Sequence, residues 1–177
     1  MDKFDIKKFK GTTYGLTPTE ASKSIIEKIK SEIKTLSSNL TFLDIGAGYG
    51  DVVNDWSKLT KMNCIGIEVL PLAYKKAIKK FPSLHIIEGD IKDNIHLLKQ
   101  ADVMYLNDIC FPDELISFCF ENCKDDVIFI CLKATTPYKI VKKYGNDIKK
   151  VVNVDTTINK MKAKAWIIHK LNTTTNR

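Results

Sequence analysis

Short apolar runs alternate with amphipathic segments along most of this 177-residue chain. The apolar runs are four to six residues long and rich in Ile, Leu and Val, which is typical of strands buried on both faces of a sheet. The segments between them repeat their apolar residues at helical spacing. The five predicted strands are Phe42–Ile45, Cys64–Val69, Leu84–Ile87, Val103–Leu106 and Val127–Leu132, and the predicted helices are Asp51–Leu59, Pro71–Lys80, a short turn at Asn94–Lys99, and Asp113–Cys123.

A further helix is predicted ahead of the first strand. Thr17 is a candidate N-cap, Pro18 suits the first turn, and Glu20 stands where a capping box places its acid. This combination indicates a helix that begins at Thr17. The apolar residues that then recur at helical spacing are Ile25, Ile26, Ile29, Ile33 and Leu36.

The end of the chain breaks the alternation of strands and helices. Two strand-like runs, Lys149–Thr156 and Ala163–Leu171, are separated by a short polar stretch that leaves no room for a crossover helix. They can pair only as an antiparallel hairpin. The sequence therefore predicts an α/β fold, a parallel sheet with helices on both faces that ends in a sixth strand and an antiparallel seventh strand. We expect a single domain over 1–177, with a lead segment at 1–16 and a core at 17–171.

A glycine-rich turn follows the first predicted strand, where the chain from Asp44 to Gly50 reads Asp-Ile-Gly-Ala-Gly-Tyr-Gly. Glycine takes positive φ without a steric penalty and lets the backbone approach a ligand closely. In a dinucleotide-binding turn a third glycine stands three residues after the second, near the pyrophosphate, and here that position is Asp51. An anion is a poor host for pyrophosphate but suits a ligand with an ammonium and a sulfonium. The turn therefore favours S-adenosylmethionine over NAD.

Acidic residues follow the next two predicted strands. Glu68 stands eighteen residues after Gly50, at the edge of the sheet where a carboxylate can accept both ribose hydroxyls of a nucleoside. Glu88 and Asp90 follow the third strand. We expect Asp90 to receive the adenine amino group and the backbone amide of Ile91 to meet the ring. The alternative is that Asp90 caps the next helix.

Composition adds a strong positive charge. The formal net charge is +7 and the isoelectric point is near 9.1, and lysine carries this charge almost alone because the only arginine is Arg177. Lysine runs at 75–80, 142–143, 149–150 and 160–164 could attract the phosphates of nucleic acid or a nucleosome, or could be solvated helix faces.

The remaining composition bounds the class of protein. We expect an intracellular protein that does not enter a membrane, because the chain begins with a charged segment and lacks a long apolar run. Five cysteines without a C-x-x-C pair indicate buried thiols in a reducing compartment, and we expect no metal site.

The fourth predicted strand ends in Leu106-Asn107-Asp108-Ile109-Cys110-Phe111. At this place in such a sheet a methyl acceptor meets the donor. The amide oxygen of Asn107 and the ring of Phe111 can orient an amine by hydrogen bonding and cation–π contact. Enzymes that methylate adenine or amide nitrogens carry two prolines here, whereas this chain has none before Pro112. This difference weakens the case for a nucleobase amine as acceptor.

Six segments of the chain together match one known family. They are Tyr14–Thr17, Leu43–Val53, Gly66–Glu68, Gly89–Asp90, Leu106–Phe111 and Trp166–His169. In this order they resemble the motifs of the disruptor-of-telomeric-silencing family of non-SET histone lysine methyltransferases, from about Gly11 to Leu171. The Tyr-Gly-x-Thr lead and the Asn-x-x-x-Phe strand end are the specific parts. The resemblance implies a single Rossmann-like, seven-stranded class I S-adenosylmethionine-dependent methyltransferase domain.

The resemblance also implies roles for individual residues. Tyr14 and Thr17 would form a loop over the methionine end of the cofactor. Asn107 and Phe111 would line a lysine channel and act with Tyr14 in catalysis, while Trp166 would replace an aromatic residue of the outer channel wall. The residues expected to bind S-adenosylmethionine are Tyr14, Thr17, Asp44, Gly46, Ala47, Gly48, Gly50, Glu68, Asp90, Ile91 and Asn107.

The chain departs from this family at Asp108, where the family usually has a second Asn, and in lacking the helical or basic extensions of its nucleosome-binding enzymes. We expect the Asp108 carboxylate to point toward cofactor or solvent, because beside the channel it would favour the ammonium form of the acceptor. The main hypothesis is a nuclear protein-lysine N-methyltransferase whose partner is a histone or nucleosome. The alternatives are a cytoplasmic enzyme for RNA, another protein or a small molecule, and a catalytically silent basic module that binds nucleic acid or a partner.

Overall fold

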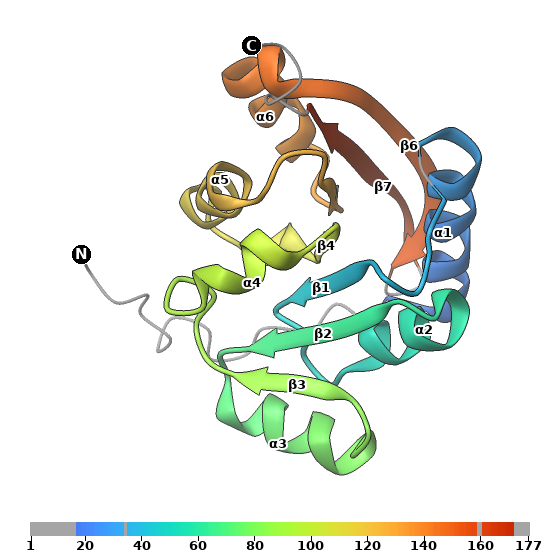
Figure 1. Ribbon diagram of the computed structural model, residues 1–177, viewed down its shortest axis with the longest axis vertical. Coiled ribbons are helices and arrows are strands. Elements are labelled where there is room, and N and C mark those ends of the chain that lie inside the picture. The colour runs from blue at the N-terminus through green and yellow to red at the C-terminus, as the bar shows by residue number, and fades with distance from the viewer. Residues whose placement is uncertain (1–16, 34, 159–160, 172–177) are drawn as a thin grey trace.

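A computed structural model describes residues 17–33, 35–158 and 161–171 of the chain. These residues form one seven-stranded sheet with the strand order β3-β2-β1-β4-β5-β7-β6 and helices on both faces (Figure 1). The predicted fold class is confirmed, including the antiparallel hairpin at the end of the chain. The strands are β1 (Thr41–Ile45), β2 (Asn63–Glu68), β3 (His85–Glu88), β4 (Val103–Leu106), β5 (Ile128–Cys131), β6 (Ile148–Ile158) and β7 (Met161–Lys170).

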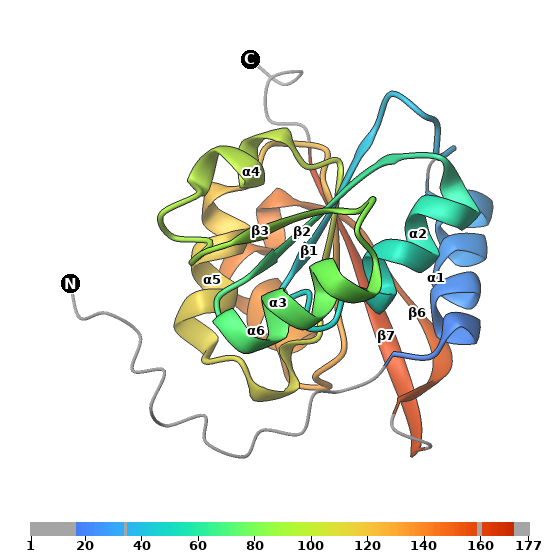
Figure 2. The same ribbon diagram turned by 90° about the horizontal axis from the view of Figure 1, so that it is seen from below.

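The helices form a layer on each side of the sheet. Helices α1 and α2 cover one face and α4, α5 and α6 the other, as the view in Figure 2 shows, and α3 packs along β2 and β3. Their bounds are α1 (Thr19–Glu32), α2 (Asp51–Thr60), α3 (Pro71–Lys80), α4 (Ile95–Gln100), α5 (Asp113–Asn122) and α6 (Thr136–Tyr144), with short 3₁₀ helices η2 (Asp108–Cys110) and η3 (Gly145–Asp147).

The core lies on both faces of the central strands. Every residue of β4 and β5 is buried, because helices cover both sides of the sheet at this point. On one face Phe42 stacks on Trp56 with ring centroids 4.1 Å apart, and on the other Phe120 meets Phe129 edge to face at 5.6 Å. This two-sided burial explains why the sequence shows continuous apolar runs for these strands.

One edge of the sheet gathers the carboxyl ends of the five parallel strands β1 to β5. Strand β7 runs antiparallel to β5 and pairs with it from Ile128 opposite His169 to Cys131 opposite Trp166. Its pairing with β6 continues to Ile158 opposite Met161, so the β6–β7 hairpin extends past the end of β5 at the same edge. All the candidate functional residues described below lie at this edge.

The predicted start of the first helix was wrong, and one helix was not predicted. Helix α1 begins at Thr19 with Pro18 at the N-cap position and no side-chain cap, because the Thr17 hydroxyl is engaged elsewhere. Glu20 accepts a hydrogen bond of 2.8 Å from Lys23 and closes no capping box. Helix α6 was not predicted at all. Its first turn contains Pro137 and its inner face offers only one buried aliphatic residue, Ile140, so the apolar pattern is weak.

Cysteine burial differs from the prediction at one position. Cys110 is exposed, while the other four cysteines are buried. Within residues 17–33, 35–158 and 161–171, no three His, Cys, Asp or Glu side chains come together in a way that could hold a metal ion. None of the helices described here is long and apolar enough to cross a membrane.

Candidate functional site

The glycine turn between β1 and α2 has the predicted left-handed backbone. Gly46, Gly48 and Gly50 have φ angles of +77°, +55° and +81°. The backbone N–H groups of Gly46 and Ala47 donate to the carbonyl of Ile67 at 2.9 and 3.0 Å, which fixes the turn to the end of β2. Since residues with a Cβ adopt such φ values at a cost, the turn depends on glycine.

Phe111 lies directly over the first glycine of this turn. A Cβ atom added to Gly46 would come within 2.6 Å of the Phe111 Cζ atom. The ring therefore occupies the space that a side chain at position 46 would need. Two residues that the sequence analysis assigned to cofactor and acceptor are thus in contact, although 65 positions separate them in the chain.

Glu68 at the end of β2 is hydrogen-bonded to the glycine turn. Its side chain is 3% exposed, and its two oxygens accept hydrogen bonds from the backbone N–H groups of Gly48 at 2.7 Å and Leu70 at 2.8 Å. Burial raises the pKa of the Glu68 carboxyl, and these backbone hydrogen bonds oppose the rise. A ribose contact is predicted for Glu68 from the sequence, whereas this second role is not. The second role couples the glycine turn to the predicted ribose ligand.

Asp44 in β1 is the most unusual charged group at this edge. It is 2% exposed, and no residue that the structure describes gives it a hydrogen bond or an opposite charge. Burial raises its pKa well above the ordinary value, and the nearby Glu68 raises it further. A buried carboxylate without a partner is unfavourable unless a ligand supplies one. The predicted cofactor carries two cationic groups that fit this need.

A pair of hydroxyls lies beside Asp44 on the same face of the sheet. Tyr105 stands opposite Asp44 in the β1–β4 register and is 1% exposed. Its hydroxyl shares a hydrogen bond of 2.7 Å with that of Thr17. Thr17 is therefore held at the carboxyl edge ahead of α1, as its predicted cofactor role requires. The sequence analysis missed Tyr105, although a tyrosine inside a buried strand signals a polar partner nearby.

The acid after β3 serves the local turn. The Asp90 carboxylate accepts a hydrogen bond of 2.9 Å from the backbone N–H of Lys92, and its backbone carbonyl accepts one of 2.8 Å from the Asn94 side chain. Asp90 therefore stabilises the turn ahead of α4 and does not cap that helix, the alternative considered above, because the N-cap position of α4 is Asn94. Ile91 is 4% exposed and packs in the core. Adenine binding by Asp90 and the Ile91 amide stays a prediction.

The end of β4 contains one clear departure from the sequence analysis. The Asp108 side chain does not point toward solvent, because it is fully buried, and its hydrogen bonds lead to the β5–α6 connection and the start of α6. One carboxylate oxygen accepts from the backbone N–H groups of Leu132 and Lys133 at 2.7 and 2.8 Å. The other accepts from the Thr136 hydroxyl at 2.5 Å. Burial raises the pKa of Asp108, and these three donors oppose the rise.

The remaining predicted residues lie around the same edge. Asn107 immediately precedes η2 and Phe111 follows it, so the two stand at opposite ends of one short helix. Trp166 lies in β7 between Cys131 of β5 and Asn153 of β6, with a buried indole N–H. Tyr14 lies outside the described residues.

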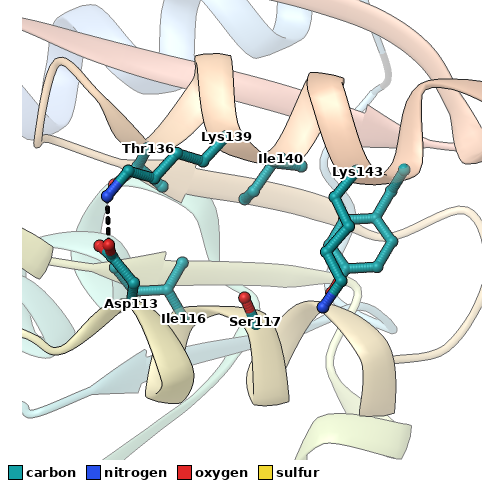
Figure 3. Close-up of a pocket in the computed structure, with 8 residues that line it drawn as sticks. Asp113, Ile116, Ser117, Thr136, Lys139, Ile140 and Lys143 are labelled. Atoms are coloured by element: carbon teal, nitrogen blue, oxygen red, sulfur yellow. Dashed lines mark hydrogen bonds and ion pairs between the residues drawn. The ribbon is translucent and has the colours of Figure 1, made fainter.

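A groove between α5 and α6 is separate from the glycine turn. Figure 3 shows Asp113 of α5 and Lys139 of α6 pointing toward each other across its mouth. Lys143, which also lines the groove, pairs with Glu121 at 2.9 Å. Since both lysines are balanced by acids, the groove offers no net charge to a ligand, and the glycine edge is the better candidate site.

Comparison with known proteins identifies the architecture. No protein-family model and no curated protein sequence matches the chain. Among solved structures, a precorrin-6y C5,15-methyltransferase from Geobacter metallireducens GS-15 superimposes with a TM-score of 0.62 and 19% identity, covering 96% of both chains. An RNA methyltransferase from Salinibacter ruber in complex with S-adenosyl-L-homocysteine gives 0.63 and 15%, covering 89% of this chain and 94% of the other.

A third structure extends this similarity to another substrate class. It is the magnesium protoporphyrin IX methyltransferase from Synechocystis PCC 6803 with bound S-adenosylmethionine, at a TM-score of 0.62 and 14% identity, covering 85% of this chain and 79% of the other. All three are named as methyltransferases, and the chain has their fold. Since their names include RNA, precorrin and porphyrin enzymes, the similarity does not favour the histone family over the others.

Proposed function

We propose that this chain is an S-adenosylmethionine-dependent methyltransferase. The single observation that carries the proposal is the buried carboxyl of Asp44, which has no partner among the described residues and lies next to a turn of three left-handed glycines. Buried groups with strongly perturbed pKa values cluster at functional sites, where a ligand can supply the partner that the described residues do not. The similarity to methyltransferases that bind S-adenosylmethionine or its demethylated product supports this choice of ligand.

The residues present fit this cofactor, which when bound supplies an electrophilic methyl group on a sulfonium. Asp44 would balance its cationic end, and Glu68 would accept its ribose hydroxyls while holding the Gly48 amide in place. The bare backbone of Gly48 would allow close approach. Metal ions have no part in this proposal.

For the acceptor we propose the amine of a protein lysine, with histones as the first substrate to test. At pH 7 a lysine of ordinary pKa must lose a proton before it can attack, which is uphill by about 4.6 kcal/mol. An apolar wall such as the Phe111 ring lowers this cost by disfavouring the ammonium. The orientation of Asp108 also supports a lysine acceptor. Its carboxylate accepts three hydrogen bonds on the side away from Asn107 and Phe111, so it does not stabilise an ammonium there.

RNA is the second candidate acceptor, and one surface of the molecule favours it. Helix α3 contains four exposed lysines and no acidic residue. Lys75 and Lys79 make no ion pair within the described part of the chain, and Lys76 lies over the ring of Tyr49 in the glycine turn, 5.1 Å from its centroid. The basic face of α3 therefore begins next to the candidate site, where it could attract a phosphate backbone.

Calorimetry with S-adenosylmethionine tests the cofactor. We expect binding to the unmodified chain and a loss of about 10²-fold or more in affinity for Glu68→Ala, since two charge-assisted hydrogen bonds disappear. Glu88→Ala is the matched control, because Glu88 also ends a strand at this edge but is exposed. No heat at millimolar cofactor, or equal losses in both variants, would overturn the proposal.

Methyl transfer from labelled S-adenosylmethionine tests the acceptor. The unmodified chain is incubated with core histones, nucleosomes or total RNA, and we expect label in lysines of the histones. Asn107→Ala should lower turnover far more than cofactor affinity, because the amide orients the acceptor. Label in RNA alone would replace the first candidate by the second, and label in none of the three would refute both.

A further inference from the structure

The loop that carries Asn107 and Phe111 is connected to the neighbouring part of the sheet through a single buried side chain. Asp108 stands between these two residues at the start of η2. Its carboxylate accepts hydrogen bonds from Leu132 and Lys133 in the connection between β5 and α6, and from Thr136, the first residue of α6. The backbone N–H of Phe111 in turn donates to the carbonyl of Asp108 at 3.0 Å. A movement of Asp108 would therefore move both flanking residues.

We propose that Asp108 is a positioning residue for methyl transfer, which holds Asn107 and Phe111 in a fixed relation to the β5–α6 connection. This inference rests on the proposed function, since it assigns Asp108 to the acceptor side of that site. The residue need not touch the cofactor or the acceptor, because its carboxylate faces the interior.

Hydrogen-bond chemistry explains why either an acid or an amide can fill this place. The amide oxygen of an Asn at 108 could accept from the backbone N–H groups of Leu132 and Lys133, as the carboxylate does. Its NH₂ group could donate to the Thr136 hydroxyl, which accepts as readily as it donates. The loop therefore requires a side chain that hydrogen-bonds to Leu132, Lys133 and Thr136, and it does not require the negative charge.

A second acid in the same segment provides a matched control. Asp113, at the start of α5, pairs with Lys133 of the β5–α6 connection at 3.3 Å. It also pairs with Lys139 of α6, as Figure 3 shows. Its side chain is 44% exposed, in contrast to the fully buried Asp108. Exposed ion pairs of this kind contribute little to rigidity. If burial and direct backbone contact are what matter, removing Asp113 should leave the reaction unchanged.

The first measurement separates turnover from cofactor binding. Full-length Asp108→Asn, Asp108→Ala and Asp113→Ala are compared with the unmodified chain, using whichever of core histones or total RNA that chain methylates. We expect Asp108→Ala to lower kcat by about 10²-fold, because a misplaced acceptor group loses near-attack geometry. The dissociation constant for S-adenosylmethionine should change much less than kcat in calorimetry, because Glu68 still holds the glycine turn by its hydrogen bond to Gly48. Asp108→Asn and Asp113→Ala should keep kcat within about threefold.

The second measurement does not need an acceptor. Hydrogen–deuterium exchange should become faster in peptides covering 107–111 and 132–136 for Asp108→Ala, and should stay unchanged for Asp108→Asn. Thr136→Val, which removes one of the three donors, gives a milder loosening if Asp108→Ala fails to fold. If loosened variants keep full kcat, or if the two segments exchange at the same rate in every variant, Asp108 is not a positioning residue. If the unmodified chain binds no S-adenosylmethionine, the proposed function fails, while the exchange result still decides whether Asp108 orders the loop.

Discussion

Two buried carboxylates at the same edge of the sheet differ in their surroundings. Asp44 in β1 and Asp108 after β4 are both almost inaccessible to water, and burial raises the pKa of each. Asp108 accepts three hydrogen bonds of 2.5 to 2.8 Å from one segment of the chain. Asp44 receives none from the described residues and lies near a second carboxyl, that of Glu68.

The contrast separates architecture from binding. A buried charge that the protein itself satisfies stabilises one arrangement of the chain, whereas one that it leaves unsatisfied raises the energy of the empty protein. The Asp108 side of the edge therefore fixes the loop beside the predicted acceptor. On the Asp44 side, the described residues supply no partner for the carboxyl, and the proposed cationic ligand would be one.

The largest expected effect on stability comes from Asp108→Ala. This change leaves two backbone N–H groups and one hydroxyl without their acceptor in a buried place, so the free energy of unfolding should fall by about 3 kcal/mol or more. Urea denaturation measures the loss, and Asp108→Asn serves as the control that keeps the three hydrogen bonds. A loss below about 1 kcal/mol for the alanine variant would erase the distinction between the two carboxylates.

Asp44→Asn should act in the opposite direction on stability. Replacing an uncompensated carboxyl by a neutral amide of similar shape should raise the free energy of unfolding by about 1–2 kcal/mol at pH 8, without ligand. Affinity for S-adenosylmethionine should fall by roughly ten- to a hundredfold, as expected when one charge-assisted contact is lost. Thermal unfolding and calorimetry on the same samples give both numbers. A variant that loses stability and keeps its affinity would show that Asp44 is a structural residue.

The smallest effect is on the pH dependence of stability. A carboxyl whose pKa is raised on folding binds more protons in the native state, so stability falls as pH rises from about 4 toward the raised pKa. Asp44, Glu68 and Asp108 all contribute in this direction. Removing the Asp44 carboxyl should flatten the decline by at most about 1.4 kcal/mol per pH unit over this range. Identical slopes for Asp44→Asn and the unmodified chain would contradict the assignment of a raised pKa to Asp44.

Much of the framework follows from local sequence signals. The observed bounds of α3 and β4 are the predicted ones, Pro71–Lys80 and Val103–Leu106. A proline opens the first of these elements, and an unbroken apolar run between polar residues defines the second. The left-handed backbone of the glycine turn was predictable for the same reason, since it depends on three glycines within five residues.

The features that were not predicted depend on distant partners. The donors to Asp108 lie 24 to 28 residues further along the chain, in a connection and a helix that the apolar pattern did not reveal. Thr17 bonds to a residue 88 positions away and so does not cap its own helix. A polar side chain with several good local roles is assigned by tertiary packing, and the sequence alone offers no measure of that competition.

The contact of Phe111 with Gly46 couples substitutions on the predicted acceptor side of the site to substitutions in the glycine turn. The ring blocks any larger residue at the first position of the turn, in addition to the backbone constraint there. A descendant that shortened Phe111 to admit a bulkier substrate would also relax one of the two restrictions on position 46. Drift in acceptor preference and drift in donor recognition would then proceed together, and a designer who alters one should screen the other in the same library.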